Sequence, residues 1–271
     1  MPTAAPLRVT LLGSGTSHGV PMIGCDCAVC RSDDPRDRRS RPSAYLDFAG
    51  RGVLIDTAPE LRLQCLACDI RRCDAVLYTH HHIDHVAGLD DLRRFNWLQK
   101  ESLPCYGRPE TLARLRQMFA YVFEHDREYP SYKPRIDLRA IDGPFEVCGV
   151  RVTPVPLLHG RMPVLGFRVG RFAYCTDVSE IPDASWPLLE GLDALVLGAL
   201  RRRPHPTHFT IDQAVAAARR IGARRTYFTH IAHELGHAET NAGLPEGMAL
   251  GHDGLAFDVM DAQSSSHNDA R

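Results

Sequence analysis

Four histidines and an aspartate lie within six residues, at positions 80 to 85, in the segment THHHIDH. The segment follows a short apolar run, Ala75–Tyr78, that predicts a buried strand. On the extended end of a strand, His80 and His82 point to the same side because side chains alternate with a period of two. Asp84 and His85 follow where the chain turns toward a helix predicted near 90–98. Such neighbouring pairs of ligands suit two cations about 3.5–4 Å apart.

The donor types narrow the choice of cation. Imidazole nitrogen and carboxylate oxygen suit zinc, manganese or iron. His81 faces away from the other side chains and receives no ligand role. The alternative interpretation is an exposed, histidine-rich turn, which the spacing of the four positions makes the less favoured one.

Three more potential ligands stand at the ends of other predicted strands. His159 ends the run TPVPLLH, Asp177 follows FAYCT, and His230 ends RTYFTH. A single histidine or aspartate after a strand is more often a turn or capping residue. Since all of these strand ends carry ligand chemistry, the sequence predicts a metal centre, and the Asp177 carboxylate could bridge two ions.

A second cluster consists of cysteines. Cys25, Cys27 and Cys30 lie in the segment GCDCAVC, too close together for unstrained disulfides. Three thiolates and one imidazole form a closed tetrahedral zinc site of the structural kind. The fourth ligand is predicted to be His233, with His237, expected in a loop, as the rival. A reactive or merely buried cysteine cluster remains the alternative.

Composition sets the broad class. The chain has 271 residues, 44% of them hydrophobic and 24% charged, which is typical of a globular protein. The net charge of -1 gives no overall field that would recruit nucleic acid or an anionic membrane. With nine cysteines a full set of internal disulfides is impossible. The remaining six, at positions 65, 68, 73, 105, 148 and 175, are expected in the core. No apolar run suits a membrane helix or a signal peptide, so we expect a cytoplasmic protein with no membrane partner.

Periodicity predicts two halves, each with several strands followed by a helix–strand unit. Helices are expected over Glu60–Cys68, Thr111–Phe123 and Ile211–Ile221. Strands are expected at Arg8–Leu12, Tyr45–Phe48, Val53–Ile55, Ala75–Tyr78, Phe145–Val147, Val150–Val155, Leu165–Val169, Arg171–Tyr174, Ala194–Leu197, Thr226–Phe228 and Leu255–Val259. This pattern predicts an α/β (α+β) chain, a two-sheet sandwich flanked by helices, as a single domain over 1–260. The segment 108–134 is a candidate lid, and the polar tail 261–271 is expected to be disordered.

The order H-x-H-x-D-H, His159, Asp177, His230 resembles the metallo-β-lactamase fold superfamily over nearly the whole chain. The resemblance implies an αββα four-layer sandwich with a binuclear site at one edge. One metal would take His80, His82 and His159, the other Asp84, His85 and His230, with Asp177 between them. With the GCDCAVC and THIAH segments added, the chain looks like the family of phosphoribosyl 1,2-cyclic phosphate phosphodiesterases (PhnP-type). That likeness implies two catalytic divalent ions (Mn²⁺ or Zn²⁺), one structural Zn²⁺ on the cysteines and His233, and an active-site histidine that maps onto His208.

The predicted function is therefore a metal-dependent phosphoric diester hydrolase acting on a small cyclic or nucleotide-like phosphodiester, such as 5-phosphoribosyl 1,2-cyclic phosphate. His208, as imidazolium, and Asp84 are the predicted catalytic residues. Four residues in RRRPH could bind a substrate phosphate or simply form a solvated loop: Arg201, Arg202, Arg203 and His205. The mixed-charge run DPRDRRSR at 34–41 is expected to form local ion pairs worth little.

Other functions fit the same ligands less well. A tRNA 3′-end endonuclease would need a protruding arm rich in Gly, Lys and Arg, which the sequence lacks, so no extended nucleic acid is expected. A thioester or lactone hydrolase is possible on this fold but leaves the cysteine cluster unexplained. A non-catalytic metal-binding scaffold is disfavoured because all seven ligands are present. A homodimer is compatible with the sequence.

Overall fold

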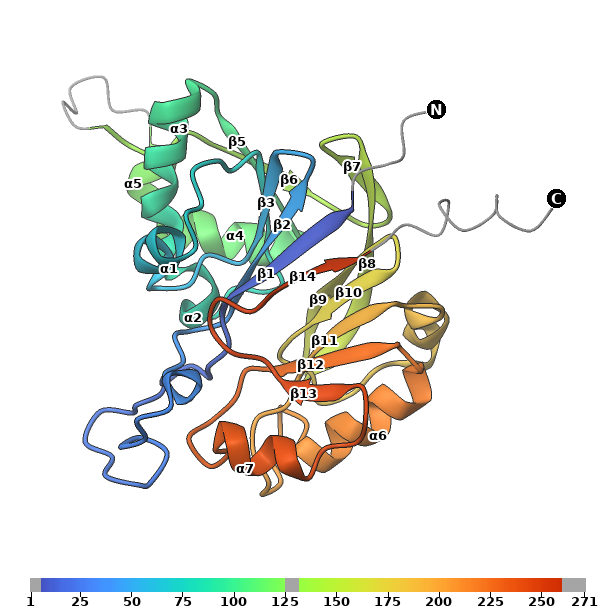
Figure 1. The fold of residues 1–271 in the computed structure, drawn as a ribbon. Helices are drawn as coiled ribbons and strands as arrows, with labels where there is room; N and C mark the ends of the chain where they lie inside the picture. Colours follow the sequence, from blue (N-terminus) through green and yellow to red (C-terminus); the bar gives the residue numbers. More distant parts are fainter. Residues whose placement is uncertain (1–5, 125–131, 260–271) are drawn as a thin grey trace, which may run out of the picture.

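The computed structural model describes residues 6–124 and 132–259, and its strands form two seven-stranded sheets within those ranges. The first sheet has the order β14 (Ala256–Val259), β1 (Leu7–Gly13), β2 (Ser43–Phe48), β3 (Arg51–Ile55), β4 (Ala75–Leu77), β5 (Leu103–Gly107), β6 (Ile136–Ala140). The second has the order β13 (Met248–Leu250), β12 (Arg225–Thr229), β11 (Ala194–Gly198), β10 (Phe172–Cys175), β9 (Met162–Val169), β8 (Val150–His159), β7 (Phe145–Val147). Figure 1 shows the two sheets face to face.

Helices cover the outer face of each sheet. On the first sheet lie α1 (Leu61–Ala67), α3 (Arg93–Gln99) and α4 (Pro109–Met118), and on the second lie α6 (Ile211–Ile221) and the 3₁₀ helix η3 (Asp183–Leu189). The shorter elements are η1 (Pro35–Asp37), α2 (Ile83–Val86), η2 (Ala87–Leu92), α5 (Ala120–Phe123) and α7 (His237–Ala242). The predicted αββα four-layer sandwich is confirmed.

Three apolar clusters hold the layers together. One lies between the sheets and includes Leu46, Phe167 and Tyr174, all buried, and the other two lie between each sheet and its helices. Such alternation of inward side chains from two sheets is the usual way a sandwich excludes water from its centre. Among the described helices, none has the length and apolar run needed to cross a bilayer.

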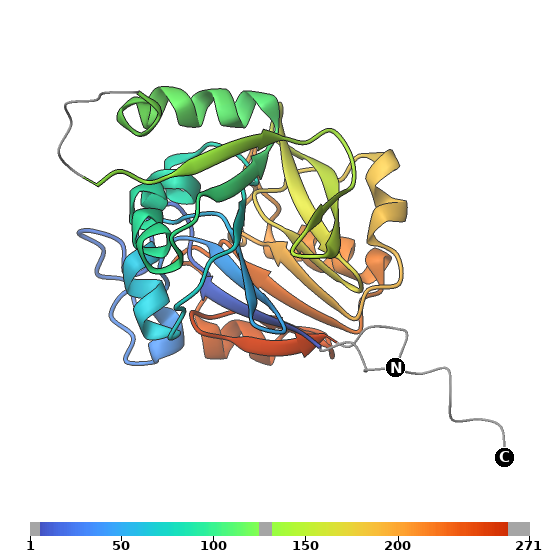
Figure 2. The same cartoon turned by 90° about the horizontal axis from the view of Figure 1, so that it is seen from above.

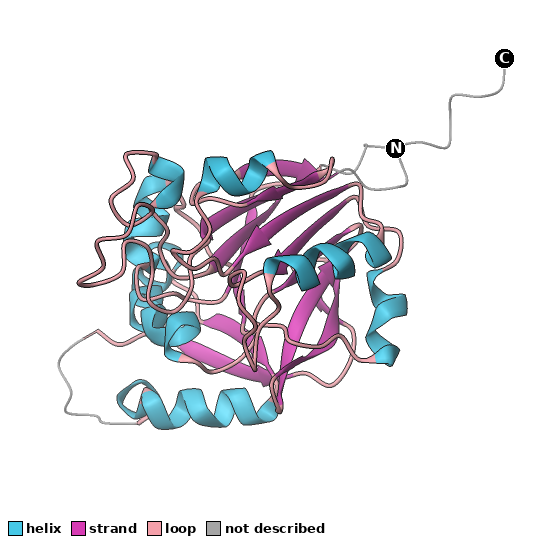
Figure 3. Cartoon of the chain, turned by 90° about the horizontal axis from the view of Figure 1, so that it is seen from below, coloured by secondary structure: helices cyan, strands magenta, loops and turns pink. Residues whose placement is uncertain are grey.

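Parallel pairing sets the position of the site. β3, β4, β5 and β6 are parallel to one another, and so are β10, β11, β12 and β13. Carboxyl ends of parallel strands meet at the same edge of a sheet, where loops can converge. Figure 3 shows the connecting loops gathered at one end of the two sheets.

Several predicted elements differ in the structure. The helix expected over Thr111–Phe123 is interrupted, because Phe119 leaves helical geometry (φ -115°, ψ 40°) between α4 and α5. β8 runs to His159 despite Pro154 and Pro156, because at these two residues it pairs only with β9 within the described chain, and prolines are tolerated where one strand edge is open. β5, β6 and β13 were not predicted.

The candidate lid lies partly outside the described residues. Its described part, α4 and α5, follows β5, and α4 packs beside β6 (Figure 2). Residues 125–131 and the tail 261–271, predicted to be disordered, are not among the described residues.

Candidate metal centre

The predicted ligands come together where the strands end. His80 and His82 follow β4, His159 ends β8, Asp177 follows β10, and His230 follows β12. The ligand atoms of His80, His82, His159 and Asp177 lie within 4.8 Å of one another, and so do those of Asp84, His85 and His230. These are the two groups that the family resemblance implies for two ions, with Asp177 lying here among the first.

Asp177 lies between the two groups. Its Oδ2 is 3.6 Å from His80 Nε2 and 3.8 Å from His159 Nε2. Its Oδ1 is 3.2 Å from Nε2 of both His85 and His230. One carboxylate oxygen therefore faces each group, which is the arrangement of a bridging ligand.

Hydrogen bonds on the far side of the rings fix which nitrogen faces the centre. The Nδ1–H of His159 donates to the Thr207 carbonyl at 2.7 Å. His80 Nδ1 lies 3.0 Å from Thr79 Oγ1, which itself donates to a carboxylate and so accepts from the ring. Each Nε2 is then an unprotonated donor atom, as a metal ligand must be.

Asp56 fixes the ring of His85 in the same way, so that Nε2 faces the centre. This role of Asp56 was not predicted from the sequence. This carboxylate, fully buried after β3, accepts from His85 Nδ1 at 2.7 Å, from the Thr79 N–H at 2.8 Å and from Thr79 Oγ1 at 2.7 Å. A carboxylate behind a ligating histidine orients the ring and raises its basicity. The available clue was its place directly after an apolar strand, as for the other ligands.

Three of these residues have backbones in the left-handed region: Asp56 (φ 62°), Asp177 (φ 51°) and His230 (φ 59°). This conformation costs a non-glycine residue about 1–2 kcal/mol. Its repetition at three strand ends of one site indicates that the surrounding hydrogen bonds hold the side chains in place against local preference.

The site favours bound cations. The Nε2 atoms of His80, His85 and His230 are buried without a hydrogen-bond partner in the described structure. Burial opposes protonation of His85, yet the carboxylates of Asp177 and Asp84 keep its pKa well above its ordinary value. Buried histidine nitrogens without hydrogen-bond partners, together with the negative charge of these two carboxylates, suit the binding of divalent metal ions.

His208 lies against this centre, as the family resemblance implies. Its ring stacks on His230 (centroids 4.7 Å apart) and meets His159 edge to face at 4.5 Å. Burial, reinforced by His230, lowers the pKa of His208 to about 2. The neutral ring, rather than the predicted imidazolium, is therefore the resting form, and it offers a single N–H donor.

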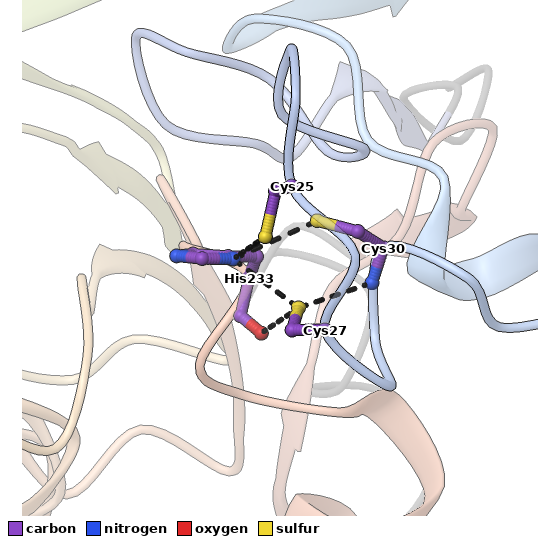
Figure 4. Close-up of side chains that lie close together, drawn as sticks. All are labelled: Cys25, Cys27, Cys30 and His233. Carbon is purple, nitrogen blue, oxygen red and sulfur yellow. Dashed lines mark hydrogen bonds between the residues drawn. The ribbon is translucent and has the colours of Figure 1, made fainter.

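The cysteine cluster closes around His233, not His237. His233 Nδ1 lies 3.2, 3.3 and 3.6 Å from the sulfurs of Cys25, Cys27 and Cys30 (Figure 4). Tetrahedral zinc with ordinary Zn–S and Zn–N bonds places sulfur and nitrogen about 3.5 Å apart. The Cys30 N–H lowers the pKa of Cys27 to about 6, which favours the thiolate that zinc requires.

The rival histidine has another environment. His237 is not in a loop, as predicted, but begins α7, where it is buried and its backbone N–H donates to Asp37 Oδ1 at 2.8 Å. The expectation of weak local ion pairs at 34–41 is wrong for Arg39. Its guanidinium is fully buried, pairs with Asp37 at 2.7 Å and donates to the carbonyls of Ala232 and Leu235.

The four candidate phosphate-binding residues point in different directions. Arg201 donates to carbonyls of its own loop, Arg203 pairs with Glu234 at 2.7 Å, and Arg202 lies 3.9 Å from Glu239. His205 alone lies beside the metal centre, with its ring 5.0 Å from that of His208.

Comparison with known proteins places this chain in one protein family. The model of the beta-lactamase superfamily domain matches residues 51–231. A diphosphatase from the PhnP family, known from a crystal structure, is 45% identical in sequence and superposes with a TM-score of 0.89. The match covers 95% of this chain and 98% of the diphosphatase chain. Zn²⁺-bound PqqB from Methylobacterium extorquens has the same fold, with a TM-score of 0.75 and 22% sequence identity. The match covers 93% of this chain and 100% of the PqqB chain.

Curated relatives are more varied in their activities. An octanoyltransferase from Porphyromonas gingivalis is 40% identical over 92% of this chain, but the chain spans only 51% of that protein. A ribonuclease Z from Mycobacterium avium is 26% identical, over 83% of this chain and 85% of its own. With the family model matched over most of the chain, this protein belongs to the beta-lactamase superfamily and, within it, is PhnP-like.

Proposed function

We propose that the protein is a binuclear metal-dependent phosphodiesterase that hydrolyses a small cyclic or nucleotide-like phosphodiester, such as 5-phosphoribosyl 1,2-cyclic phosphate. The observation that carries this proposal is the position of Asp177, with one carboxylate oxygen toward each histidine group. Two cations held side by side suit a phosphoryl centre, whose two non-bridging oxygens carry the charge.

In this proposal His80, His82 and His159 hold one ion, Asp84, His85 and His230 hold the other, and Asp177 is shared. Zinc and manganese both suit these donors. When bound, such ions supply Lewis acidity that neutralises charge on the phosphoryl oxygens and acidifies water. Cys25, Cys27, Cys30 and His233 hold a third, structural zinc.

The residues around the ions orient the reactants. Asp84 Oδ2, 3.4 Å from both His85 and His230, is an acceptor that can take a hydrogen bond from the attacking water. The neutral His208 ring donates an N–H hydrogen bond to the leaving oxygen as the P–O bond breaks, and the proton that this oxygen takes up comes from the attacking water. Its stacking on His230 keeps that donor beside the second metal position.

A second candidate, cleavage of a diphosphate, is favoured by the 45% identical PhnP-family diphosphatase. Both substrates present a phosphorus with two bridging oxygens, but the leaving groups differ. An alkoxide needs a proton or hydrogen bond as it leaves, whereas phosphate is stable as an anion. Loss of His208 should therefore impair diester hydrolysis more than diphosphate hydrolysis.

The test is hydrolysis by Mn²⁺- or Zn²⁺-loaded protein of bis(p-nitrophenyl) phosphate, a ribose cyclic phosphate and a diphosphate, beside His82→Ala. The phosphodiesterase proposal requires diester turnover that the variant loses together with metal content. Turnover of the diphosphate alone would select the second candidate. No turnover of any phosphate substrate by fully metallated protein would refute both, and thioester, lactone and RNA substrates would follow.

A further inference from the structure

A groove of about 770 Å³ lies between α1 and α3, in the layer of helices outside the first sheet (Figure 1). Its floor consists of Leu61, Cys65 and Phe95, whose side chains are all buried. The volume is typical of sites for small molecules, which occupy about 300–1,000 Å³. No predicted metal ligand lines this α1–α3 groove, so it is separate from the metal centre.

Two leucines lie exposed beside this floor. Leu66 on α1 is 65% exposed and Leu98 on α3 is 45% exposed, and both line the groove. With the buried floor they give the groove an apolar interior that is open to solvent. Exposed apolar surface of this kind loses contact with water when an apolar chain lies against it, and that loss favours binding.

Cationic side chains lie at one end of the groove. Arg62 precedes Leu66 by four residues on α1, and Arg94 precedes Leu98 by four residues on α3, so each pair shares one helix face. The two helices begin at the same end, because Asp91, two residues before α3, lies near the Arg62 backbone N–H at the start of α1. The groove therefore has a cationic end at the two arginines and an apolar end at the two leucines.

These two guanidinium groups are available to a ligand. Arg62 and Arg94 are exposed, and neither side chain forms an ion pair or hydrogen bond within the described chain. Arg94 lies 4.5 Å from the centroid of the Trp97 ring, a contact that restricts the side chain without neutralising its charge. The other three arginines that line the groove each pair with an aspartate. Unpaired guanidinium groups suit an anionic head group, which they bind by charge-assisted hydrogen bonds.

The apolar end of the groove is bounded by the chain itself. Residues 69–72 line it after α1. The Gln99 side chain at the end of α3 accepts from the Cys73 N–H and donates to the Cys73 carbonyl, both at 2.9 Å. A groove bounded at one end suits a ligand with one head and one tail better than a long helix, which would extend beyond both ends.

A second copy of this chain fits the groove poorly. Together α1 and α3 carry three arginines and no acidic residue. A symmetric contact between two copies of this face would bring like charges together, which opposes association. Since five arginines and two aspartates line the groove, its net charge favours an anionic ligand.

We propose that the α1–α3 groove binds a small amphiphile with one anionic head and an unbranched apolar chain, such as a fatty acid anion. The head lies at Arg62 and Arg94, and the chain lies over the buried floor between Leu66 and Leu98. This binding site is independent of the proposed hydrolysis, because it contains none of the predicted metal ligands.

The test is calorimetric titration of the metal-loaded protein with 1-decanesulfonate, below the concentration at which this probe forms micelles. Sulfonate is a weak ligand for metal ions, so the probe reports the groove rather than the metal centre. Decyltrimethylammonium has the same chain with a cationic head, and methanesulfonate has the same head without the chain. We expect 1-decanesulfonate to bind at least about 10-fold more tightly than either, because each of them lacks one of the two complementary parts.

The double variant Arg62→Ala/Arg94→Ala should weaken the binding of 1-decanesulfonate by about 10- to 100-fold, and lysine at both positions should restore part of the affinity. Leu66→Ser should weaken it as well, because contact with the chain is lost. Arg219→Ala is the matched control, because Arg219 is also an exposed helical arginine without an ion pair, but it lies on α6 outside the groove. This control should leave the affinity unchanged.

Equal affinity of the wild type for the anionic and cationic amphiphiles would overturn the proposal, and so would wild-type affinity in the double variant. Co-sedimentation with phosphatidylcholine vesicles that contain phosphatidylglycerol is the second measurement. Protein that binds these vesicles but not monomeric 1-decanesulfonate would also overturn it, and would identify the groove as a contact for a lipid surface.

Discussion

Asp56→Asn should weaken metal binding although residue 56 is not itself a predicted ligand. The carboxylate accepts three hydrogen bonds, and an amide offers only one acceptor atom. If the amide nitrogen takes the Oδ2 position, it faces His85 Nδ1 and favours the tautomer with its proton on Nε2. His85 Nε2 lies 3.2 Å from Asp177 Oδ1, and once protonated it would no longer offer the lone pair that a metal ion needs.

The other amide orientation is no better. The NH₂ group would then face the backbone N–H of Thr79, a buried donor that cannot turn away. Either orientation loses at least one hydrogen bond in a fully buried place, at a cost of about 1–3 kcal/mol. Loss of such an orienting partner lowers metal affinity by about 10- to 100-fold.

Metal affinity is measured by competition with a chromophoric chelator, and the thermal midpoint is measured on the same samples. Asp74→Asn is a matched control, because Asp74 also accepts from several donors, but it precedes β4, whereas the metal ligands follow β4. We expect Asp74→Asn to lower stability and leave metal affinity unchanged. Wild-type metal affinity in Asp56→Asn would refute the assignment of Asp56 as the residue that orients His85.

Three further outcomes are expected. Cys27→Ser should lose one zinc per chain by elemental analysis and lower the thermal midpoint, whereas full zinc content would contradict a Cys3His site. His208→Ala should lower kcat for a phosphodiester by about 100-fold or more with unchanged metal content, and an unchanged kcat would exclude His208 from the reaction. Burial opposes ionisation of Asp74, but hydrogen bonds from Arg72 and Arg51 lower its pKa. Its contribution to stability should be complete above about pH 4 and fall as pH drops through the lowered folded-state pKa. Urea unfolding of Asp74→Asn and wild type should therefore differ by about 1–3 kcal/mol at pH 7 and converge in acid, and a constant difference would contradict the role of this carboxylate.

The sequence predicts this site well because its ligands follow a local rule. His80, Asp177 and His230 each follow an apolar strand that is parallel to a neighbouring strand, and parallel strands bring such ends together whatever the details of the loops. His159 ends an apolar strand too, although β8 is antiparallel to its neighbours. Asp56 obeys the same rule after Val53–Ile55 and could have been found, but a single aspartate with no histidine beside it resembles a turn residue.

Burial of charge was not predictable in the same way. Arg39 lies in a run of mixed charges that is typical of a solvent-exposed segment, and no sequence signal in this run distinguishes Arg39 from Arg36 or Arg41. Only the folded chain shows that it lies under the segment at 232–237. The arginines at 201–203 show the opposite error, because their clustering suggested that they bind one phosphate together. In the structure their partners are Glu234, Glu239 and backbone carbonyls.

Arg39 also explains how the two predicted metal sites are related. The segment after β12 supplies His230 to the histidine centre and His233 to the cysteine cluster, three residues apart. Between and after these histidines, the carbonyls of Ala232 and Leu235 accept from the buried guanidinium of Arg39. A buried charge of this kind is stable only while its partners stay in place, so displacement of this segment would leave Arg39 without acceptors. The segment that carries both His230 and His233 is therefore held by Arg39, and the two predicted metal sites share this support.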